Sequence, residues 1–317
     1  MNQFECLPNE ILLEILRYFN ARDLFHSFIH LNARFNQLIQ SLPYLSLTLT
    51  KQSNSLDRIS TSLIYTLKID HTIHVDLNRF PNLHRLILLS PTSNQLKQLV
   101  FHSLPVLKHL TIGYEHFLFS SYLTDVCEKI FSNSYPNLVS CYFYEPRITE
   151  ILPNLSTTNR IRRLKLDNID FNTYKSILSL CPNLNYLSFR IIPQNEQDTQ
   201  HRLIYPHLNL QRMRIKYQNL VNNHSDFIFL SYLSLVPNLI ELTLNEINFD
   251  SQLIDYLQSN WFSSLISQYL HELKQLKYIL YIYERKYQEN KFLLELKKTF
   301  FHVHRNKYQT ELLLQFS

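Results

Sequence analysis

Apolar residues recur along most of the chain in one local pattern. A clear copy is FPNLHRLIL at 80–88, which reads Pro-x-Leu-x-x-Leu-x-apolar. Side chains alternate between the two faces of a strand, so this pattern places Leu86 and Leu88 on the same face of a short strand. Further copies, some of them without the proline, stand at 61–69, 104–112, 135–143, 158–166, 181–189, 207–215 and 236–244.

The copies follow one another at a nearly regular interval. Their central apolar positions are Leu67, Leu86, Leu110, Cys141, Leu164, Leu187, Met213 and Leu242. The steps between these positions run from 19 to 31 residues. Between two copies, Ile177, Leu178 and Cys181 are spaced as one face of a helix. Each unit is therefore predicted to be a strand followed by a helix, and its proline ends the helix and begins the next strand.

A unit of this kind cannot bury its own apolar side, and stacking of neighbouring units does so. The period and the Leu-x-x-Leu-x-Leu spacing resemble those of leucine-rich repeats. The resemblance implies an α/β protein in which residues 56–260 form a repeat solenoid, or horseshoe. Many such repeats carry Asn three residues after the last strand leucine, but Ile169, Ile192 and Ile247 occupy that slot here. This departure argues against a buried asparagine ladder and favours the longer, helix-containing repeat type.

The strand residues between the core positions face the other, concave side of such a solenoid, which is the usual binding face. The candidate target-binding residues on that face are Arg85, His109, Arg163, Lys165, Tyr186, Arg214 and Glu241. The set is mixed basic and polar, so a solvated sheet face without a ligand stays an alternative.

Residues 261–317 have a different composition. They are rich in Tyr, Phe, Lys and His and lack the Pro-x-Leu start. We interpret this region as a C-terminal cap that covers the open core of the last repeat, because solenoids require one. A basic, aromatic surface for nucleic acid is the alternative.

Three short helices are predicted before the repeats. Pro8 suits a first helical turn, and the apolar face of the first helix consists of Ile11, Leu12, Ile15, Leu16 and Phe19. Asn20 and Asp23 are start signals for a second helix over 22–31, and Asn32 can cap a third helix that Pro43 ends. A segment of this length is too short to bury a full core by itself. Some of these apolar side chains must therefore be covered by the repeats or by another chain.

This N-terminal region, residues 4–45, resembles the F-box. The residues that carry the resemblance are Leu7, Pro8, Glu10, Ile11, Leu12, Ile15, Leu16, Asp23, Leu24, Arg34 and Phe35. The family often has Val-Cys before the third helix, where this chain has Leu31-Asn32. The resemblance implies docking to the Skp adaptor of a cullin-based ubiquitin ligase. The adaptor-binding residues it implies are Leu7, Pro8, Glu10, Ile11, Leu12, Ile15, Leu16, Leu24, Leu31 and Phe35. Which of these residues face the adaptor and which face the domain's own core stays open at this point.

The two resemblances together imply a substrate-recognition subunit without catalytic residues of its own. The N-terminal helices would bind the Skp-type adaptor and the cullin ligase core, and the repeats would hold a protein target of unknown identity. One alternative is an interaction scaffold that plays no part in ubiquitination, and another is a nucleic-acid-binding repeat protein.

The amino-acid composition excludes several classes of nucleotide-binding and hydrolytic site. The 317 residues contain one glycine, Gly113, so neither a P-loop nor a dinucleotide-binding loop nor a Gly-x-Ser-x-Gly elbow can form. Asn must supply turns that Gly normally supplies. The net charge of +5 is dispersed along the chain, so it is weak evidence for a nucleic-acid partner.

The cysteines and the lengths of the apolar runs indicate which kinds of site and which cellular environment to expect. None of the four cysteines stands in a Cys-x-x-Cys pair, so no metal site or cofactor is predicted. Cys127 and Cys141 fall at core positions of the repeats, where buried and inert thiols are usual. The sequence shows no signal peptide, and its apolar runs are too short to span a bilayer. We therefore expect no membrane partner and a soluble protein of the cytoplasm, the nucleus or both.

Overall fold

The chain forms an α/β structure in which the described strands pair in parallel. This computed structural model describes residues 3–51, 59–70, 73–113, 121–143, 160–191, 205–217, 231–246, 266–282 and 309–316, together with residues 56, 157 and 298. Eleven strands follow one another in chain order within these residues. The chain divides into two compact units, Met1–Tyr144 and Glu145–Ser317. The α/β class predicted from the sequence is confirmed.

The first unit begins with three short helices, as the sequence predicts, although the second ends at Ser27 and not at residue 31. After a 3₁₀ turn η1 (Gln3–Cys6), they are α1 (Asn9–Leu16), α2 (Ala21–Ser27) and α3 (Ala33–Ser41). The side chain of Asn20 accepts a hydrogen bond from the Asp23 N–H at 3.0 Å, and that of Asn32 accepts one from the Phe35 N–H at 3.0 Å. These bonds satisfy N–H groups that a helix start leaves without an internal partner, which explains where α2 and α3 begin.

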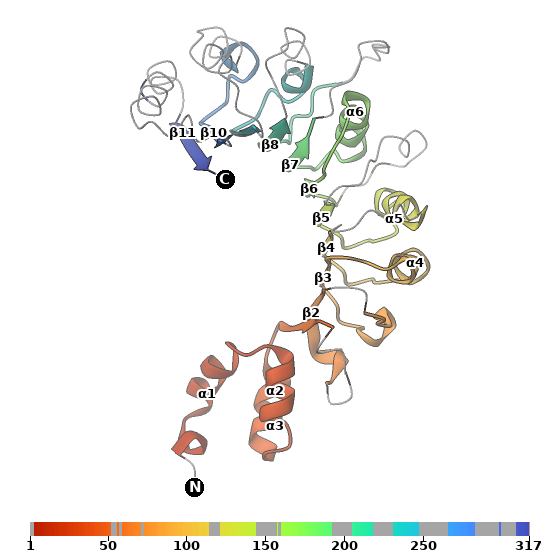
Figure 1. Ribbon diagram of the computed structural model, residues 1–317, viewed down its shortest axis with the longest axis vertical. Helices are drawn as coiled ribbons and strands as arrows, with labels where there is room; N and C mark the ends of the chain where they lie inside the picture. The colour runs from red at the N-terminus through yellow and green to blue at the C-terminus, as the bar shows by residue number, and fades with distance from the viewer. Residues whose placement is uncertain are drawn as a thin grey trace. The chain divides into compact units, whose positions relative to one another are not determined.

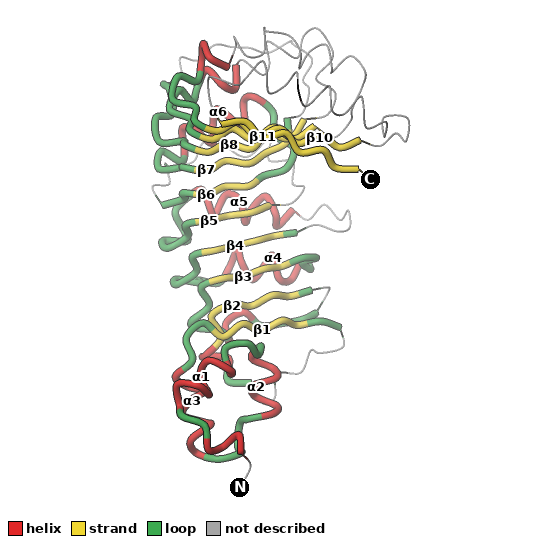
Figure 2. Tube along the Cα trace, turned by 90° about the vertical axis from the view of Figure 1, so that its left-hand side faces the viewer, coloured by secondary structure: helices red, strands yellow, loops and turns green. Residues whose placement is uncertain are grey.

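Strands and helices then alternate in the first unit. Their bounds are β1 (Leu45–Leu49), η2 (Thr61–Leu63), β2 (Ile64–Ile69), η3 (Leu77–Arg79), β3 (Arg85–Leu88), α4 (Ser93–Phe101), β4 (His109–Ile112), α5 (Ser121–Phe131) and β5 (Ser140–Phe143). Figure 2 shows β1 to β5 as successive parallel rungs. The pairing aligns a buried row of side chains, Leu47, Leu67, Leu86, Leu110 and Cys141. Helices α4 and α5 lie on one side of the strands (Figure 1).

The second unit repeats this arrangement. Its described elements are β6 (Arg163–Lys165), α6 (Phe171–Leu180), β7 (Tyr186–Arg190), β8 (Arg212–Tyr217), β9 (Glu241–Glu246), β10 (Gln275–Ile282) and β11 (Gln309–Phe316). Their buried row is Leu164, Leu187, Met213, Leu242 and Leu276. Within each unit, therefore, the strand pairing aligns the same central positions as the sequence repeat.

The region 261–317 also contributes to the sheet. Strand β10 pairs with β9, and β11 pairs with β10, both in parallel. The series of strands thus runs past residue 261, where the repeat pattern with its proline ends. Strand β1 likewise precedes residue 56, where the recognisable repeats begin.

An aromatic core joins helix α6 to the strands of the second unit. The Tyr174 hydroxyl donates a hydrogen bond to the Tyr232 carbonyl at 2.8 Å, and their ring centroids lie 4.7 Å apart. The ring of Phe189 stacks on that of Tyr232 at 5.4 Å. Ile177, Leu178 and Cys181 are buried on the same helix and its cap, as their spacing predicts.

The prolines of the repeats occupy tight turns. The Leu83 N–H donates to the Phe80 carbonyl across Pro81, and the Leu184 N–H donates to the Cys181 carbonyl across Pro182. Proline suits the second position of such a turn because its ring fixes φ near the required value. Its role is thus to shape the turn into the strand as well as to end the helix.

Asparagines link these turns to one another, although not at the position considered from the sequence. Ile169 is buried, and Ile192 and Ile247 lie outside the described residues. Instead, the Asn immediately before the first leucine of a repeat donates its side-chain N–H to a backbone carbonyl in the preceding turn. The bonds are Asn82 to Ser62 (2.8 Å), Asn137 to Pro105 (2.7 Å), Asn209 to Pro182 (2.8 Å) and Asn238 to Leu208 (3.1 Å).

The lone glycine is required by close packing of the backbone. Gly113 follows β4, and its N–H donates to the Leu88 carbonyl at 2.7 Å. A Cβ at this position would lie 2.7 Å from the Leu89 carbonyl oxygen. Positive φ is carried elsewhere in the described chain by His30, Tyr44, Asn133 and Asn168, so Asn does supply turns that Gly often supplies.

The asparagine bonds between turns predict a stability difference. Asn137→Ala should lower the free energy of unfolding by roughly 0.5–1.5 kcal/mol, the usual contribution of one hydrogen bond. Val106 occupies the same slot in the preceding repeat. Val106→Asn should therefore leave stability unchanged or raise it. Urea titration followed by circular dichroism measures both variants, and equal midpoints for Asn137→Ala and the parent chain would contradict the role of the bond.

The contact at the glycine predicts a larger loss. Gly113→Ala should destabilise the chain by about 1–3 kcal/mol, the usual cost of forcing an extra group into a packed site. Asn133→Gly is the matched control, because φ is 64° there and glycine adopts that conformation without strain. Thermal unfolding of the two variants tests the argument, which fails if Gly113→Ala melts with the parent chain.

Candidate functional site

The Leu-Pro segment before helix α1 is held by Arg34 of helix α3. Its guanidinium donates to the Asn9 side chain at 2.7 Å and to the backbone carbonyls of Glu5 and Leu7 at 2.6 and 2.5 Å. A guanidinium can reach three acceptors at once because its donors form a rigid planar fork. Arg34 therefore fixes the conformation in which Leu7 and Pro8 are presented.

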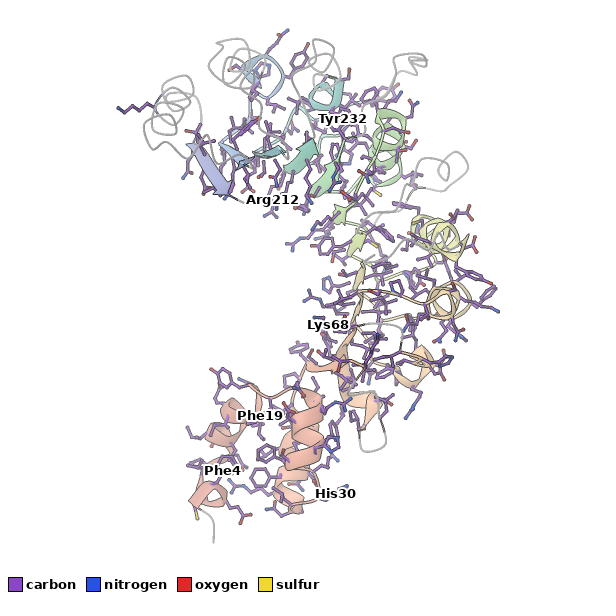
Figure 3. All side chains as sticks on the ribbon, in the orientation of Figure 1. Phe4, Phe19, His30, Lys68, Arg212 and Tyr232 are labelled. Atoms are coloured by element: carbon purple, nitrogen blue, oxygen red, sulfur yellow. The ribbon has the colours of Figure 1, made fainter. Side chains whose placement is uncertain are left out.

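Four phenylalanines tie the N-terminal helices together. Phe28, after α2, lies 5.8 Å from Phe35 of α3 and 5.4 Å from Phe19, which follows α1. Phe4 lies 5.9 Å from Phe35 and 6.1 Å from Phe28. Figure 3 shows Phe4 and Phe19 among these helices. Aromatic pairs at these distances contribute beyond their buried area, so the helices hold one arrangement.

The structure separates the ten adaptor-binding residues that the F-box resemblance implies. Leu12, Leu16, Leu24 and Phe35 are buried, with 1% or less of each side chain exposed. Leu7 and Ile15 are half-buried. The exposed members of the set are Pro8, Glu10, Ile11 and Leu31.

We call the exposed apolar members Pro8, Ile11 and Leu31, together with the half-buried Ile15, the N-terminal apolar surface. Ile11 is 48% exposed and Leu31 is 57% exposed, although both are large and apolar. Pro8, Ile11 and Ile15 are three and four residues apart, so they share one side of α1 and its start. Water covers them in this chain by itself, and a protein partner could bury them.

A second candidate surface is the open face, the side of the strands opposite the helices in each unit. It carries the residues that alternate with the buried rows. Figure 3 places Arg212 and Tyr232 on opposite sides of the strands of the second unit, with Arg212 on the open face. All seven target-binding candidates from the sequence lie on strands, at positions that alternate with the buried rows.

In the first unit, the structure brings Arg85 and His109 together. They are register partners on β3 and β4. Arg85 is exposed, and His109 is half-buried. The Nδ1 atom of His109 lies 2.6 Å from the hydroxyl of Ser140, its register partner on β5. This hydrogen bond fixes the imidazole on the open face.

In the second unit, the other five candidates form two rows. Arg163, Tyr186 and Glu241 belong to a row that Arg212 completes. Lys165 and Arg214 belong to the next row, with Ser188 between them. The pairing thus brings together residues that are more than twenty positions apart in the sequence.

A third row of the second unit was missed by the sequence analysis. It contains Arg190 and Lys216, which are register partners, and Asn245 follows on β9. Asp167, just after β6, places its Oδ1 3.2 Å from Arg190 Nε. The alternation two residues beyond Ser188 and Arg214 is the signal that could have found Arg190 and Lys216.

The charges of this region perturb Lys216. Burial lowers the pKa of its ammonium group, and the neighbouring cations Lys165, Arg190 and Arg214 lower the pKa further. Asp167 acts in the opposite direction and raises it. The open face of β6 to β8 is therefore a region where positive charge has accumulated against one nearby carboxylate.

The cysteine thiols of the repeat cores are buried. Cys127, Cys141 and Cys181 are inaccessible, whereas Cys6 is exposed. Burial raises the pKa of the Cys127 and Cys181 thiols to about 12, so both stay protonated at neutral pH. A protonated and inaccessible thiol is a poor nucleophile and a poor metal ligand, in agreement with the interpretation of Cys127 and Cys141 as core residues.

The described residues contain no cluster of three or more His, Cys, Asp or Glu side chains arranged to bind a metal ion. None of the helices in this part of the chain has the length and apolar character needed to cross a bilayer.

No protein-family model matches this chain, and none of the curated proteins matches it. The two candidate surfaces are therefore identified only from the exposure, charge and arrangement of their own residues.

Burial of the thiols predicts selective labelling. In the native protein at pH 8, a thiol reagent such as DTNB should react rapidly with Cys6 alone. Denaturation in guanidinium chloride should release the other three. The absorbance of the released thiolate counts the reacted groups, and Cys6→Ser should abolish the rapid phase. Rapid native labelling of two or more thiols would contradict the burial.

Proposed function

We propose that this chain is a substrate-recognition subunit of a cullin-based ubiquitin ligase. In this proposal, the N-terminal apolar surface binds a Skp-type adaptor, and the open face of the strands binds a protein target. The single observation that carries the proposal is the exposure of Ile11 and Leu31, although Leu12, Leu16, Leu24 and Phe35 of the same region are buried.

The burial pattern supports docking by these helices. Leu12, Leu16, Leu24 and Phe35 supply their internal contacts. Ile11 and Leu31 do not contribute to that core, although they belong to the positions that resemble the F-box. Large apolar side chains left exposed are typical of an interface core, which a partner would surround with polar contacts.

The position of Arg34 adds a second argument. Its three hydrogen bonds hold the backbone at Glu5 and Leu7 and the side chain of Asn9. A segment fixed in this way loses little conformational entropy when it binds, which favours affinity. Arg34 and Phe35 are the Arg-Phe pair of the F-box resemblance, and the contacts of Arg34 give that pair a physical role.

A receptor of this kind needs no catalytic group. It raises the effective concentration of the target beside a ubiquitin carrier, and the carrier supplies the chemistry. An interaction scaffold would use the same adaptor contact without target turnover. For a ligase subunit, a bound target is degraded when residues 1–45 are present and persists when they are deleted. For a scaffold, deleting these residues does not change the lifetime of the target.

The docking proposal predicts the effect of one charge. Ile11→Asp should weaken binding to a purified Skp-type adaptor by about tenfold or more, because an unpaired carboxylate is costly in an apolar interface. The thermal midpoint should stay close to that of the parent chain, since Ile11 is exposed. Surface plasmon resonance measures the affinity, and differential scanning fluorimetry measures the midpoint.

Gln37→Asp is the matched control, because Gln37 is an exposed polar residue of helix α3. It should leave adaptor binding unchanged. Leu12→Asp tests the assignment of the core, and it should lower the thermal midpoint. If the Ile11→Asp protein binds the adaptor like the parent chain, or if the parent chain does not bind it, the proposal is wrong.

A further inference from the structure

Three polar side chains meet on the open face of strands β6, β7 and β8. Ser188 is the register partner of Lys165 on one side and of Arg214 on the other. Adjacent strands lie about 4.8 Å apart, so the two cations flank the serine at the distance of one strand each. Ser188 is small and lies at the bottom of this arrangement, with 1% of its surface exposed.

Two more cations lie in the adjoining row. Arg190 is two residues after Ser188, and Lys216 is two residues after Arg214, so both lie about 7 Å further along the strands on the same face. Asp167 is the acidic group close to them, at 3.2 Å from Arg190. Four cationic side chains are thus gathered around one carboxylate, which leaves a local excess of positive charge.

Arg190 Nε is buried and makes an ion pair with Asp167 but no hydrogen bond, and two further buried donors of this cluster have no partner in the described part of the chain. They are the Ser188 hydroxyl and Arg214 Nε, which make no hydrogen bond there. Buried polar groups are nearly always hydrogen-bonded, so each exception needs an explanation. A ligand that accepts hydrogen bonds and carries negative charge would satisfy both donors and the excess of charge together.

We propose that Lys165, Ser188, Arg190, Arg214 and Lys216 form a binding site for a phosphoryl group or an equivalent doubly charged oxyanion. Arg214 and Lys216 donate charged hydrogen bonds to the oxygens, and the Ser188 hydroxyl donates from the floor of the site. The charged form of Lys216 is disfavoured in the empty site by burial and by its cationic neighbours. A bound dianion opposes that penalty, because its negative charge raises the pKa of the Lys216 ammonium group.

The dimensions of the site favour one phosphoryl group over a nucleic-acid strand. The cations cover three strands and two rows, which is about 10 by 7 Å. Glu241 and the Lys277–Glu311 ion pair, at 2.9 Å, place carboxylates on the strands that follow. A track of phosphates would pass over these carboxylates, whereas one phosphoryl group does not reach them.

This site does not depend on the proposed adaptor docking, because it lies in the second unit and on different residues. It does share Lys165 and Arg214 with the open face that is proposed to bind a protein target. Failure of the phosphoryl site would leave adaptor binding at Ile11 untouched. Failure of adaptor binding would equally leave the phosphoryl site standing.

The test uses the full chain and inorganic phosphate in a chloride buffer of constant ionic strength. Isothermal titration calorimetry should show saturable binding of phosphate at one site. Arg214→Gln should weaken it by about tenfold or more, the usual effect of one lost charge-assisted hydrogen bond. Ser188→Ala should also weaken it, and it should not lower the thermal midpoint, because the hydroxyl it removes is unpaired in the free protein.

Arg162→Gln is the matched control. Arg162 is an exposed arginine next to the site's strand β6 in sequence, and it lies outside the rows of the site. Arg162→Gln removes one positive charge from the second unit, as Arg214→Gln does. It should leave phosphate affinity unchanged within about twofold, since exposed charges at a distance are screened by salt.

Further titrations identify the source of the phosphoryl group. If a phosphoserine peptide binds more tightly than inorganic phosphate, the natural ligand is a phosphorylated protein segment. If the two bind with equal affinity, the natural ligand is free phosphate. Both outcomes support the site. The proposal is wrong if phosphate does not bind, if Arg162→Gln weakens binding as much as Arg214→Gln does, or if Ser188→Ala has no effect. It is also wrong if single-stranded RNA binds with a steep salt dependence while phosphate does not compete.

Discussion

The alignment of one apolar side chain from each strand with the next is the constraint on which the other features depend. Leu67, Leu86 and Leu110 illustrate it in the first unit, and Leu164 and Leu187 in the second. A shift of the pairing by one residue would turn every strand over and expose this row. Because the row is buried, the alternate residues of each strand must face outward. The register that forms the core therefore also defines the open face and brings its cations together.

The two candidate surfaces have opposite chemistry because the local folds differ. The N-terminal helices close an apolar and aromatic core of their own, and Arg34 fixes the segment before α1, so Ile11 and Leu31 remain exposed. The open face of the second unit instead gathers long polar side chains over a sheet whose apolar side is covered. An apolar surface suits a protein adaptor, and a charged surface with unpaired donors suits an anion. The two surfaces thus differ in chemistry and consist of different residues.

Much of the fold could be predicted from the sequence, because local patterns determine it. The spacing of the repeats gave the aligned strand positions within each unit, and Asn20 and Asn32 gave the helix starts. The region 261–317 was harder to interpret, because β10 and β11 lack the Pro-x-Leu start that marks other strands. The asparagine bonds between turns were missed, since they connect repeats more than twenty residues apart and leave no local signal in either one.

The sequence by itself determined which strand residues alternate between core and open face, because that alternation follows from backbone geometry alone. It also determined the likeness of residues 4–45 to an F-box, which motivates the proposed function. Only the tertiary structure decided that Leu12 and Phe35 are buried while Ile11 is exposed, since burial depends on how three helices pack. It alone placed Arg190 and Lys216 beside Ser188 and Arg214, because neighbours across parallel strands are set by pairing and not by distance along the chain.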